Sequence, residues 1–178
     1  MQISGQRDNF ALMNSEKSIS VAFTGHRTYA GEADAQLRLT LRQLYDEGYR
    51  CFVCGMAWGW DLAAGEAVIE LKNEHPEIEL VAVVPFADFR TLFHDEDLEQ
   101  YDRVAGSADR VVVSGDYTSA CNAAFRQRND YLVDNASLVV AWYDNKPRSG
   151  TAYTIRQARR KHIPVINLMP RQQLSLEF

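Results

Sequence analysis

Cysteine is scarce in this sequence, and the three cysteines among 178 residues are too few, and odd in number, for a framework of disulfide bonds. Cys51 and Cys54 have the spacing of a redox or zinc motif, but they lie in a strand-like run, Cys51-Phe52-Val53-Cys54. Side chains three residues apart on a strand point to opposite faces, so we interpret these thiols as small packing residues. With Cys121, they fit a reducing compartment. The histidines show no ligand spacing, and we predict no metal site and no cofactor.

Long hydrophobic runs and an excess of positive charge are also lacking. No apolar segment approaches the roughly 20 residues that span a bilayer, and residues 1–8 lack the apolar stretch of a signal peptide. We therefore expect a cytoplasmic protein with no membrane association. The formal net charge of -5 gives the surface no general attraction for nucleic acid, so binding to nucleic acid would need a local basic patch.

The sequence does contain a regular alternation of strand and helix patterns. Its length and its 46% of hydrophobic residues suffice for one well-buried core. We predict an N-terminal arm over residues 1–17, a single domain over 18–169 and a C-terminal tail over 170–178. Within the domain, apolar runs predict strands over 18–23, 51–54, 80–84, 110–114, 138–143 and 164–168. Helical spacing predicts helices over 33–47, 61–74, 95–105, 123–135 and 151–161.

This alternation predicts an α/β fold, a Rossmann-like three-layer α/β/α sandwich with a mostly parallel sheet of about six strands. In an open parallel sheet, ligands bind beyond the carboxyl ends of the strands, at the point where the strand order reverses. Loops and helix N-termini converge there. Residues that directly follow strands, or that begin helices, are therefore the first candidates for a binding site.

The first candidate segment is Gly25-His26-Arg27, which follows the first predicted strand. A glycine allows the backbone to turn sharply. His26 and Arg27 would then project over the sheet edge, where a phosphate could bind. The alternative interpretation is an ordinary turn whose neighbouring side chains are solvated.

The second candidate segment, Gly55-x-x-x-Gly59-x-Asp61, follows the second predicted strand. It matches neither the dinucleotide fingerprint nor the Walker loop, but two glycines before a helix let a ligand approach free backbone N–H groups. Asp61 is either a helix N-cap or a ligand contact. Glu66 lies among small residues that leave room for a ligand, so it is either a functional carboxylate or part of a solvated helix face.

Two further candidates belong to the last two helices. Arg128-Asn129, expected in the first turns of its helix, would direct guanidinium and amide donors at a phosphate, unless Arg128 instead pairs with a nearby aspartate. Ser149-Gly150-Thr151 presents hydroxyls and backbone N–H groups at the positive end of the final helix, which suits an anion. The alternative for this segment is plain N-capping by Ser149.

Taken together, these motifs resemble the YpsA-like branch of the SMF/DprA-LOG superfamily, known as SLOG. The resemblance covers about residues 18–168. It rests on four segments in the same order: Val21-Ala22-Phe23-Thr24-Gly25-His26-Arg27, Gly55-x-x-x-Gly59-x-Asp61-x-x-Ala64-x-Glu66, Arg128-Asn129 to Asp134, and Ser149-Gly150-Thr151-x-x-Thr154. The resemblance implies a Rossmannoid domain of bacterial type whose glycine loops bind a nucleotide or a nucleotide-derived ligand.

Members of this superfamily differ in activity. LOG enzymes are phosphoribohydrolases that release a free base from a nucleoside monophosphate, whereas DprA binds single-stranded DNA. LOG enzymes carry P-G-G-x-G-T-x-x-E, with a catalytic final acid; here Gly150-Thr151 matches the G-T and Thr154 stands in place of the acid. A hydroxyl cannot replace a carboxylate in activating water or stabilising an oxocarbenium-like state. Hydrolysis of the LOG type would therefore have to use Glu66 or Asp61.

The end of the chain suggests a separate interaction. Residues 173–178 are similar to the Q-L-x-L-x-[LF] peptide by which bacterial replication proteins dock on the sliding clamp. The residues that would make this contact are Gln173, Leu174, Leu176 and Phe178. The alternative is a tail that packs on its own domain or on a second copy in a homo-oligomer.

The leading prediction is a sensor or regulatory module that binds a nucleotide or nucleotide-derived phosphorylated ligand. Its phosphate would be held by Gly25, Arg27, Gly59, Arg128 and the Ser149-Gly150-Thr151 helix end. An N-glycosidic hydrolase or transferase acting on nucleotides, with Glu66 or Asp61 as its carboxylate, and single-stranded DNA binding as in DprA are the two alternatives. The leading prediction requires that segments 25–27, 55–61 and 149–151 meet at one rim of the fold.

Overall fold

Six parallel strands form a sheet in the order β4-β3-β2-β1-β5-β6. The computed structural model describes residues 17–115 and 121–170. Nearly all of the predicted N-terminal arm and C-terminal tail, including Gln173, Leu174, Leu176 and Phe178, lies outside the described residues. The predicted α/β sandwich with a parallel sheet of about six strands is confirmed.

Helices alternate with the strands along the described chain. The strands are β1 (Ser20–Gly25), β2 (Cys51–Cys54), β3 (Glu79–Val84), β4 (Arg110–Val113), β5 (Leu138–Trp142) and β6 (Val165–Asn167). The helices are α2 (Asp34–Asp46), α3 (Trp60–Glu74), the 3-10 helix η1 (Ala87–Leu92), α4 (Asp95–Ser107), α5 (Cys121–Asp134) and α6 (Gly150–Arg160). None of these described helices is long and apolar enough to cross a bilayer.

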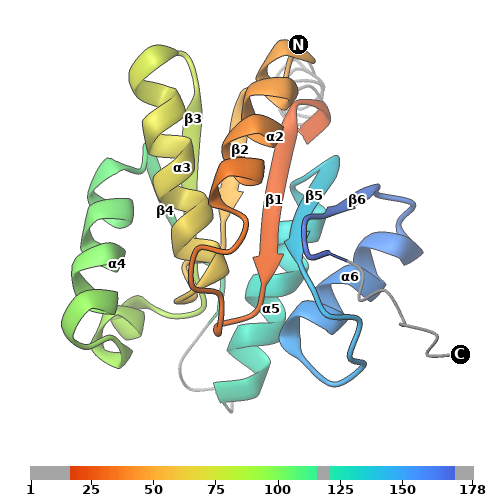
Figure 1. The fold of residues 1–178 in the computed structure, drawn as a ribbon. Helices are drawn as coiled ribbons and strands as arrows, with labels where there is room; N and C mark the ends of the chain where they lie inside the picture. Colours follow the sequence, from red (N-terminus) through yellow and green to blue (C-terminus); the bar gives the residue numbers. More distant parts are fainter. Residues whose placement is uncertain (1–16, 116–120, 171–178) are drawn as a thin grey trace, which may run out of the picture.

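The helices cover the sheet on both faces. Helices α2, α3 and α4 pack side by side on one face, and α5 and α6 pack together on the other (Figure 1). Each face has its own buried hydrophobic cluster, because strands covered on both sides carry apolar side chains in both directions. Cys54 belongs to the cluster under α3 and Cys51 to the opposite one, which confirms that these two thiols point apart.

The order of the strands reverses beside β1. From β1 to β4 the chain adds each strand on the same side, and it then returns to place β5 on the other side of β1. The loops that leave β1 and β5 therefore diverge to opposite faces, and a crevice opens between them at the carboxyl ends of the two strands. The reversal thus fixes where a ligand site belongs in this fold.

Most observed boundaries lie within two residues of the predicted ones, and three differences bear on the site or on the number of elements. The first strand ends at Gly25, which pairs with Trp142 of β5, so this glycine is the last residue of the strand and not part of the loop. The 3-10 helix η1 was not predicted, since its six residues are too few to show helical spacing. The prediction that Arg128 lies in the first turns of its helix is wrong, because α5 begins as early as residue 121.

Candidate functional site

A cleft of about 810 Å³ opens where β1 and β5 end. It lies between the loop after β1, the start of α3, α5 and the segment that leads into α6. Nine of the residues singled out in the sequence line it: Gly25, His26, Arg27, Asp61, Arg128, Asn129, Ser149, Gly150 and Thr151. The segments from strands β1, β2 and β5 therefore meet at one rim of the sheet, as the leading prediction requires.

Three other predicted residues lie outside the lining of this cleft. Gly59 and Glu66 line a second, smaller cavity of about 390 Å³. The carbonyl oxygen of Gly55 accepts a hydrogen bond from the Arg128 guanidinium, and a side chain at this position would overlap Arg128 and Asp61. Gly55 thus has an indirect role at the cleft, since its lack of a side chain leaves room for the buried pair of Arg128 and Asp61.

The cleft gathers positive charge in an acidic chain. Five arginines line it, Arg27, Arg126, Arg128, Arg148 and Arg156, and we call it the arginine cleft. Among the described residues, Asp61 is the single acid in its lining. The lining of the cleft therefore carries four more positive charges than negative ones, although the whole chain has a net charge of -5. This cleft is the local basic patch that binding of a polyanion requires.

Arg128 and Asp61 form a buried ion pair at the floor of the arginine cleft. The Nη1 of Arg128 lies 3.1 Å from Oδ2 of Asp61, and the two side chains are only 8% and 5% exposed. Asp61 also accepts a hydrogen bond of 3.4 Å from the backbone N–H of Ala57. It does not cap α3 with its side chain, so the N-cap alternative is wrong. The Nε of Arg128 is buried and has no hydrogen-bond partner in the described part of the chain.

Burial makes the charge of Asp61 sensitive to pH. Desolvation raises the pKa of its carboxyl from 3.8 to about 6, although Arg128 opposes the shift. Because this folded-state pKa is above the unfolded one, the stabilisation from protonating Asp61 is complete below about pH 4 and is lost as the pH rises through about 6.

The Asp61→Asn variant has no carboxyl group at position 61 to titrate. We expect its free energy of unfolding to rise relative to that of the wild type as the pH increases from about 4 to about 7. Urea denaturation of both proteins at several pH values in this range measures the difference in free energy of unfolding. All other carboxyls are common to the two proteins and cancel. A difference that does not change with pH would contradict the assignment of the raised pKa to Asp61.

Arg27 stands at the edge of the cleft on an aromatic support. Its guanidinium carbon lies 3.9 Å from the ring centroid of Trp58, and Trp58 packs edge-on against Phe93. Partial burial, and after it the nearby charge of Arg128, lower the pKa of Arg27 from its ordinary value. Two cations held this close, with one carboxylate between them, form a site that a bound anion would stabilise.

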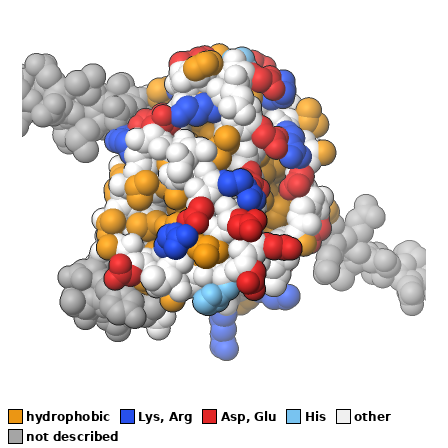
Figure 2. All heavy atoms as spheres, turned by 90° about the vertical axis from the view of Figure 1, so that its left-hand side faces the viewer, with side chains coloured by type: hydrophobic (Ala, Val, Ile, Leu, Met, Phe, Trp, Pro, Cys, Tyr) orange, Lys and Arg blue, Asp and Glu red, His pale blue; other side chains and the backbone are white. Residues whose placement is uncertain are grey.

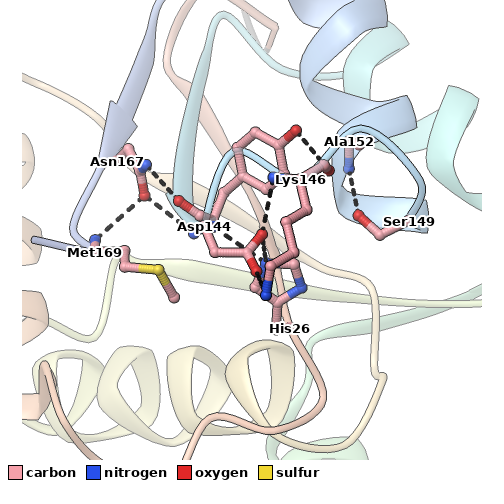
Figure 3. Close-up of polar contacts among 8 residues, drawn as sticks. His26, Asp144, Lys146, Ser149, Ala152, Asn167 and Met169 are labelled. Atoms are coloured by element: carbon pink, nitrogen blue, oxygen red, sulfur yellow. Dashed lines mark hydrogen bonds and ion pairs between the residues drawn. The ribbon is translucent and has the colours of Figure 1, made fainter. Parts of the chain in front are cut away.

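His26 ties together the two loops that flank the cleft. Its Nε2 lies 2.9 Å from Oδ1 of Asp144, which follows β5 (Figure 3). The backbone N–H of Lys146 donates to the same carboxylate, and this bond, assisted by the Lys146 and His26 side chains, lowers the pKa of Asp144 to about 2. One ring nitrogen of His26 is thus committed to a structural contact between β1 and β5.

The loop between β5 and α6 is fixed by several further contacts. Asn167 at the end of β6 accepts a hydrogen bond from the backbone N–H of Tyr143 and donates one to its carbonyl oxygen (Figure 3). The Tyr143 hydroxyl donates to the carbonyl of Lys146. Ser149 then caps α6 by accepting from the N–H of Ala152, which confirms the capping interpretation. The first N–H groups of α6 are therefore held in place at the cleft.

The model of the YspA SLOG family, YpsA, matches residues 15–169. The chain belongs to the YspA SLOG family. The chain is also similar to a UPF0398 protein of Bacillus pumilus and to the SPbeta prophage-derived protein YoqJ of Bacillus subtilis. The first is 27% identical over 70% of this chain and 67% of its own length, and the second is 29% identical over 63% and 71%.

Solved structures share the fold of this YspA SLOG protein. DNA processing protein A (DprA) of Streptococcus pneumoniae superposes with a TM-score of 0.65 at 22% identity, over 89% of this chain and 53% of that one. DprA of Helicobacter pylori gives a TM-score of 0.63 at 19% identity, over 93% and 70%. This chain therefore spans about half of the pneumococcal DprA chain and about two thirds of several relatives.

The candidate carboxylate Glu66 and Thr154, which stands in place of the LOG catalytic acid, both make structural contacts outside the arginine cleft. Glu66 accepts hydrogen bonds from Arg103 and Gln100 of α4, and so holds α3 against α4. This side of the protein carries interspersed charges of both signs (Figure 2). Thr154 is fully buried and donates to the carbonyl of Gly150 within α6. Among the described residues, His, Cys, Asp and Glu form no group of three or more that could hold a metal ion.

Several residues of the arginine cleft were not predicted as site residues. On α5, Asn122, Phe125 and Arg126 share one helical face with the predicted Asn129, and they line the cleft as it does. On α6, Tyr153 and Arg156 are three residues apart and line it as well. The helical period was thus a signal for these residues. Arg148, in a loop, has no such signal beyond its place directly before Ser149.

Proposed function

We propose that this member of the YspA SLOG family binds a nucleotide or nucleotide-derived phosphorylated ligand in the arginine cleft and acts as a sensor or regulatory module. The observation that carries the proposal is the gathering of five arginines and one acid at the point where the strand order reverses. Parallel α/β sheets bind ligands at this point. A positively charged cleft in a chain of net charge -5 favours an anionic ligand.

The N-terminus of α6 supports the same proposal. The first backbone N–H groups of a helix have no partner within it, and they carry the positive end of the helix dipole. Ser149 satisfies the N–H of Ala152, and Gly150 and Thr151, which begin the helix, both line the cleft. Arg128, which is nine-tenths buried, adds an unpartnered Nε in the described part of the chain. A phosphate oxygen is the kind of acceptor that both features favour.

The shape and lining of the cleft favour a nucleotide over a bare phosphate. A volume of about 810 Å³ lies in the range of cavities that bind whole cofactor-sized ligands. Phe125 and Tyr153 supply aromatic surface beside the cations, and a nucleobase can pack on such rings. The phosphate end and the base end of one ligand would therefore both find suitable groups.

The proposal is tested by calorimetric titration with AMP, GMP, CMP and UMP, and with adenosine as the unphosphorylated comparison. We expect at least one monophosphate to bind, adenosine to bind far more weakly, and Arg27→Gln to lower the affinity roughly tenfold because a charge-assisted hydrogen bond is lost. Arg159→Gln, an exposed arginine in the last turn of α6 that does not line the cleft, is the matched control. Equal affinity of the Arg27 variant and the wild type would contradict the proposed site.

Enzymatic cleavage of the ligand has less support from the site. Glu66 faces α4 and the smaller cavity, and Asp61 is committed to Arg128. A general base or nucleophile for N-glycosidic hydrolysis would need a carboxylate free to approach water or sugar. We therefore propose binding without turnover. Release of free base from a nucleotide, lost in Glu66→Gln, would favour the enzyme instead.

Single-stranded DNA is a second candidate ligand, favoured by one observation. The fold matches DprA structures, and the Helicobacter pylori structure is described by its single-stranded DNA binding mode. The arginine cleft could contact a DNA backbone. Gel shifts with single-stranded DNA at low and moderate salt test this candidate, because phosphate contacts weaken steeply as salt rises. No shift even at low salt would remove it.

A further inference from the structure

The arginines of the cleft fall into two groups that differ in their partners. Arg128 is buried at the floor beside Asp61, and Arg27, which is itself exposed, is held on Trp58 and interacts electrostatically with both Arg128 and Asp61. Arg126, Arg148 and Arg156 are exposed at the rim, on α5, on the loop before α6 and on α6. We call these two groups the floor arginines and the rim arginines.

The floor is suited to one phosphate. The floor arginines carry two positive charges, which Asp61 partly offsets, and the N-terminus of α6 adds the equivalent of about half a charge. A phosphate monoester carries close to two negative charges at neutral pH. One such group could bond to Arg27, to the Nε of Arg128 and to the first N–H groups of α6. Its charge would balance the net positive charge of the floor.

The rim then remains unsatisfied. Within the part of the chain that the structure describes, Arg126 and Arg148 make no hydrogen bond or ion pair, and Arg156 bonds only to the carbonyl of Pro147. The nearby Asp130 accepts from the Tyr153 hydroxyl and does not pair with these cations. Three arginines around one opening repel one another, and a ligand with a single phosphate in the floor would leave that repulsion in place.

This distribution of charge points beyond a monophosphate. We infer that the ligand of the arginine cleft carries two phosphate groups, one held at the floor by Arg27 and Arg128 and one held at the rim by Arg126, Arg148 and Arg156. The inference rests on the proposed function and adds the class of ligand. The two phosphates are either joined as a pyrophosphate or carried at separate positions of the nucleotide, since the same rim chemistry recognises both.

The experiment compares ligands that differ by one phosphate. Wild-type protein is titrated calorimetrically with AMP, ADP and adenosine 3′,5′-bisphosphate, and with the corresponding guanine, cytosine and uracil compounds. We expect a second phosphate to raise the affinity roughly tenfold or more, as charge-assisted hydrogen bonds imply. The diphosphate and the bisphosphate arms tell which arrangement of phosphates the cleft prefers.

A pair of variants tests the role of the rim. Arg126→Gln with Arg148→Gln removes two side chains that have no partner to lose in the described structure, so the fold should be retained. Arg159→Gln with Arg160→Gln removes the same charge from the last turn of α6, outside the cleft. We expect the first pair to abolish the gain from the second phosphate, so that its affinity for diphosphates falls roughly tenfold more than its affinity for monophosphates. We expect the second pair to leave both affinities unchanged.

Each other outcome overturns a defined part of the proposal. Monophosphate binding without any gain from a second phosphate, or a gain that survives in the rim variant, overturns this inference and leaves the proposed function standing. Failure of every nucleotide to bind overturns the proposed function and the inference with it. Binding of a single-stranded oligonucleotide that the rim variant weakens, without a gain for small diphosphates, assigns the rim arginines to a DNA backbone and overturns the inference.

Discussion

Replacing Asp61 by alanine is expected to lower the free energy of unfolding by about 1–3 kcal/mol, because the variant leaves the buried guanidinium of Arg128 and the backbone N–H of Ala57 without their hydrogen-bond acceptor. The two side chains are 5% and 8% exposed, with Nη1 and Oδ2 separated by 3.1 Å. Water therefore cannot take over the role of the carboxylate without opening the floor of the cleft. Urea denaturation followed by tryptophan fluorescence, at about pH 8 where Asp61 is ionised, measures the change.

A double variant separates the ion pair from the loss of packing. Replacing Arg128 by methionine as well removes the stranded charge and keeps most of the apolar volume. We expect Asp61→Ala with Arg128→Met to be more stable than Asp61→Ala alone, since breaking a buried pair on one side costs more than replacing both partners. Additive losses in the double variant would show that the two side chains do not interact.

Replacing Gly25 by alanine is expected to destabilise the fold by about 1–3 kcal/mol through overpacking. A Cβ built at this position would overlap the Cβ, Cγ and Cδ1 atoms of Trp60. Trp60 cannot move aside easily, because its ring is fully buried, meets Tyr29 edge-on and stacks on Trp142. The expected result is a lower melting temperature together with an altered near-UV circular dichroism signal from these rings.

Gly106→Ala is the matched control for this prediction. Gly106 lies in α4, and a Cβ there would meet no atom within 4 Å. Alanine in a helix is favoured over glycine by about 0.5–1 kcal/mol, so this variant should be as stable as the wild type or more stable. If Gly25→Ala behaves like Gly106→Ala, the close approach of β1 to Trp60 does not hold in solution.

The consequence of Gly25→Ala for ligand binding follows from where Trp60 sits. Trp60 begins α3 directly after the Gly59 turn, and its backbone N–H donates to the carbonyl of His26. Displacing Trp60 would therefore shift the loop that carries Arg27. We expect weaker binding of nucleotides to Gly25→Ala than its loss of stability alone would produce, measured by titration at a temperature where the variant is fully folded.

Periodicity explains why most of the fold could be predicted. The strand over 51–54 was predicted at its observed limits, and the predicted ends of the α-helices lie within a few residues of the observed ends. The spacing of apolar residues made this possible, because it depends on which face of a helix or strand is buried. The end of β1 was missed because Gly25 shows no apolar preference. Its strand conformation comes from pairing with Trp142, more than 100 residues further along the chain.

The candidate site, like the fold, could be predicted from the sequence only in part. Chain order and residue chemistry were enough to predict that Gly25, Arg27, Arg128 and the Ser149-Gly150-Thr151 segment belong to one rim, since parallel strands end at a common edge. They could not show that Arg128 points into the floor and pairs with Asp61, 67 residues earlier in the chain. They also could not show that Glu66 turns away toward Arg103.

The amino-acid sequence by itself therefore determined the α/β class, the order of its elements and the segments that could bind an anion, because local hydrophobic periodicity and the positions of glycines act within a few neighbouring residues. Only the tertiary structure decided which of those side chains share the arginine cleft and which form ion pairs elsewhere. The physical reason is that burial and charge pairing depend on contacts between residues far apart in the chain, and those contacts exist only once the sheet has brought the ends of β1, β2 and β5 together.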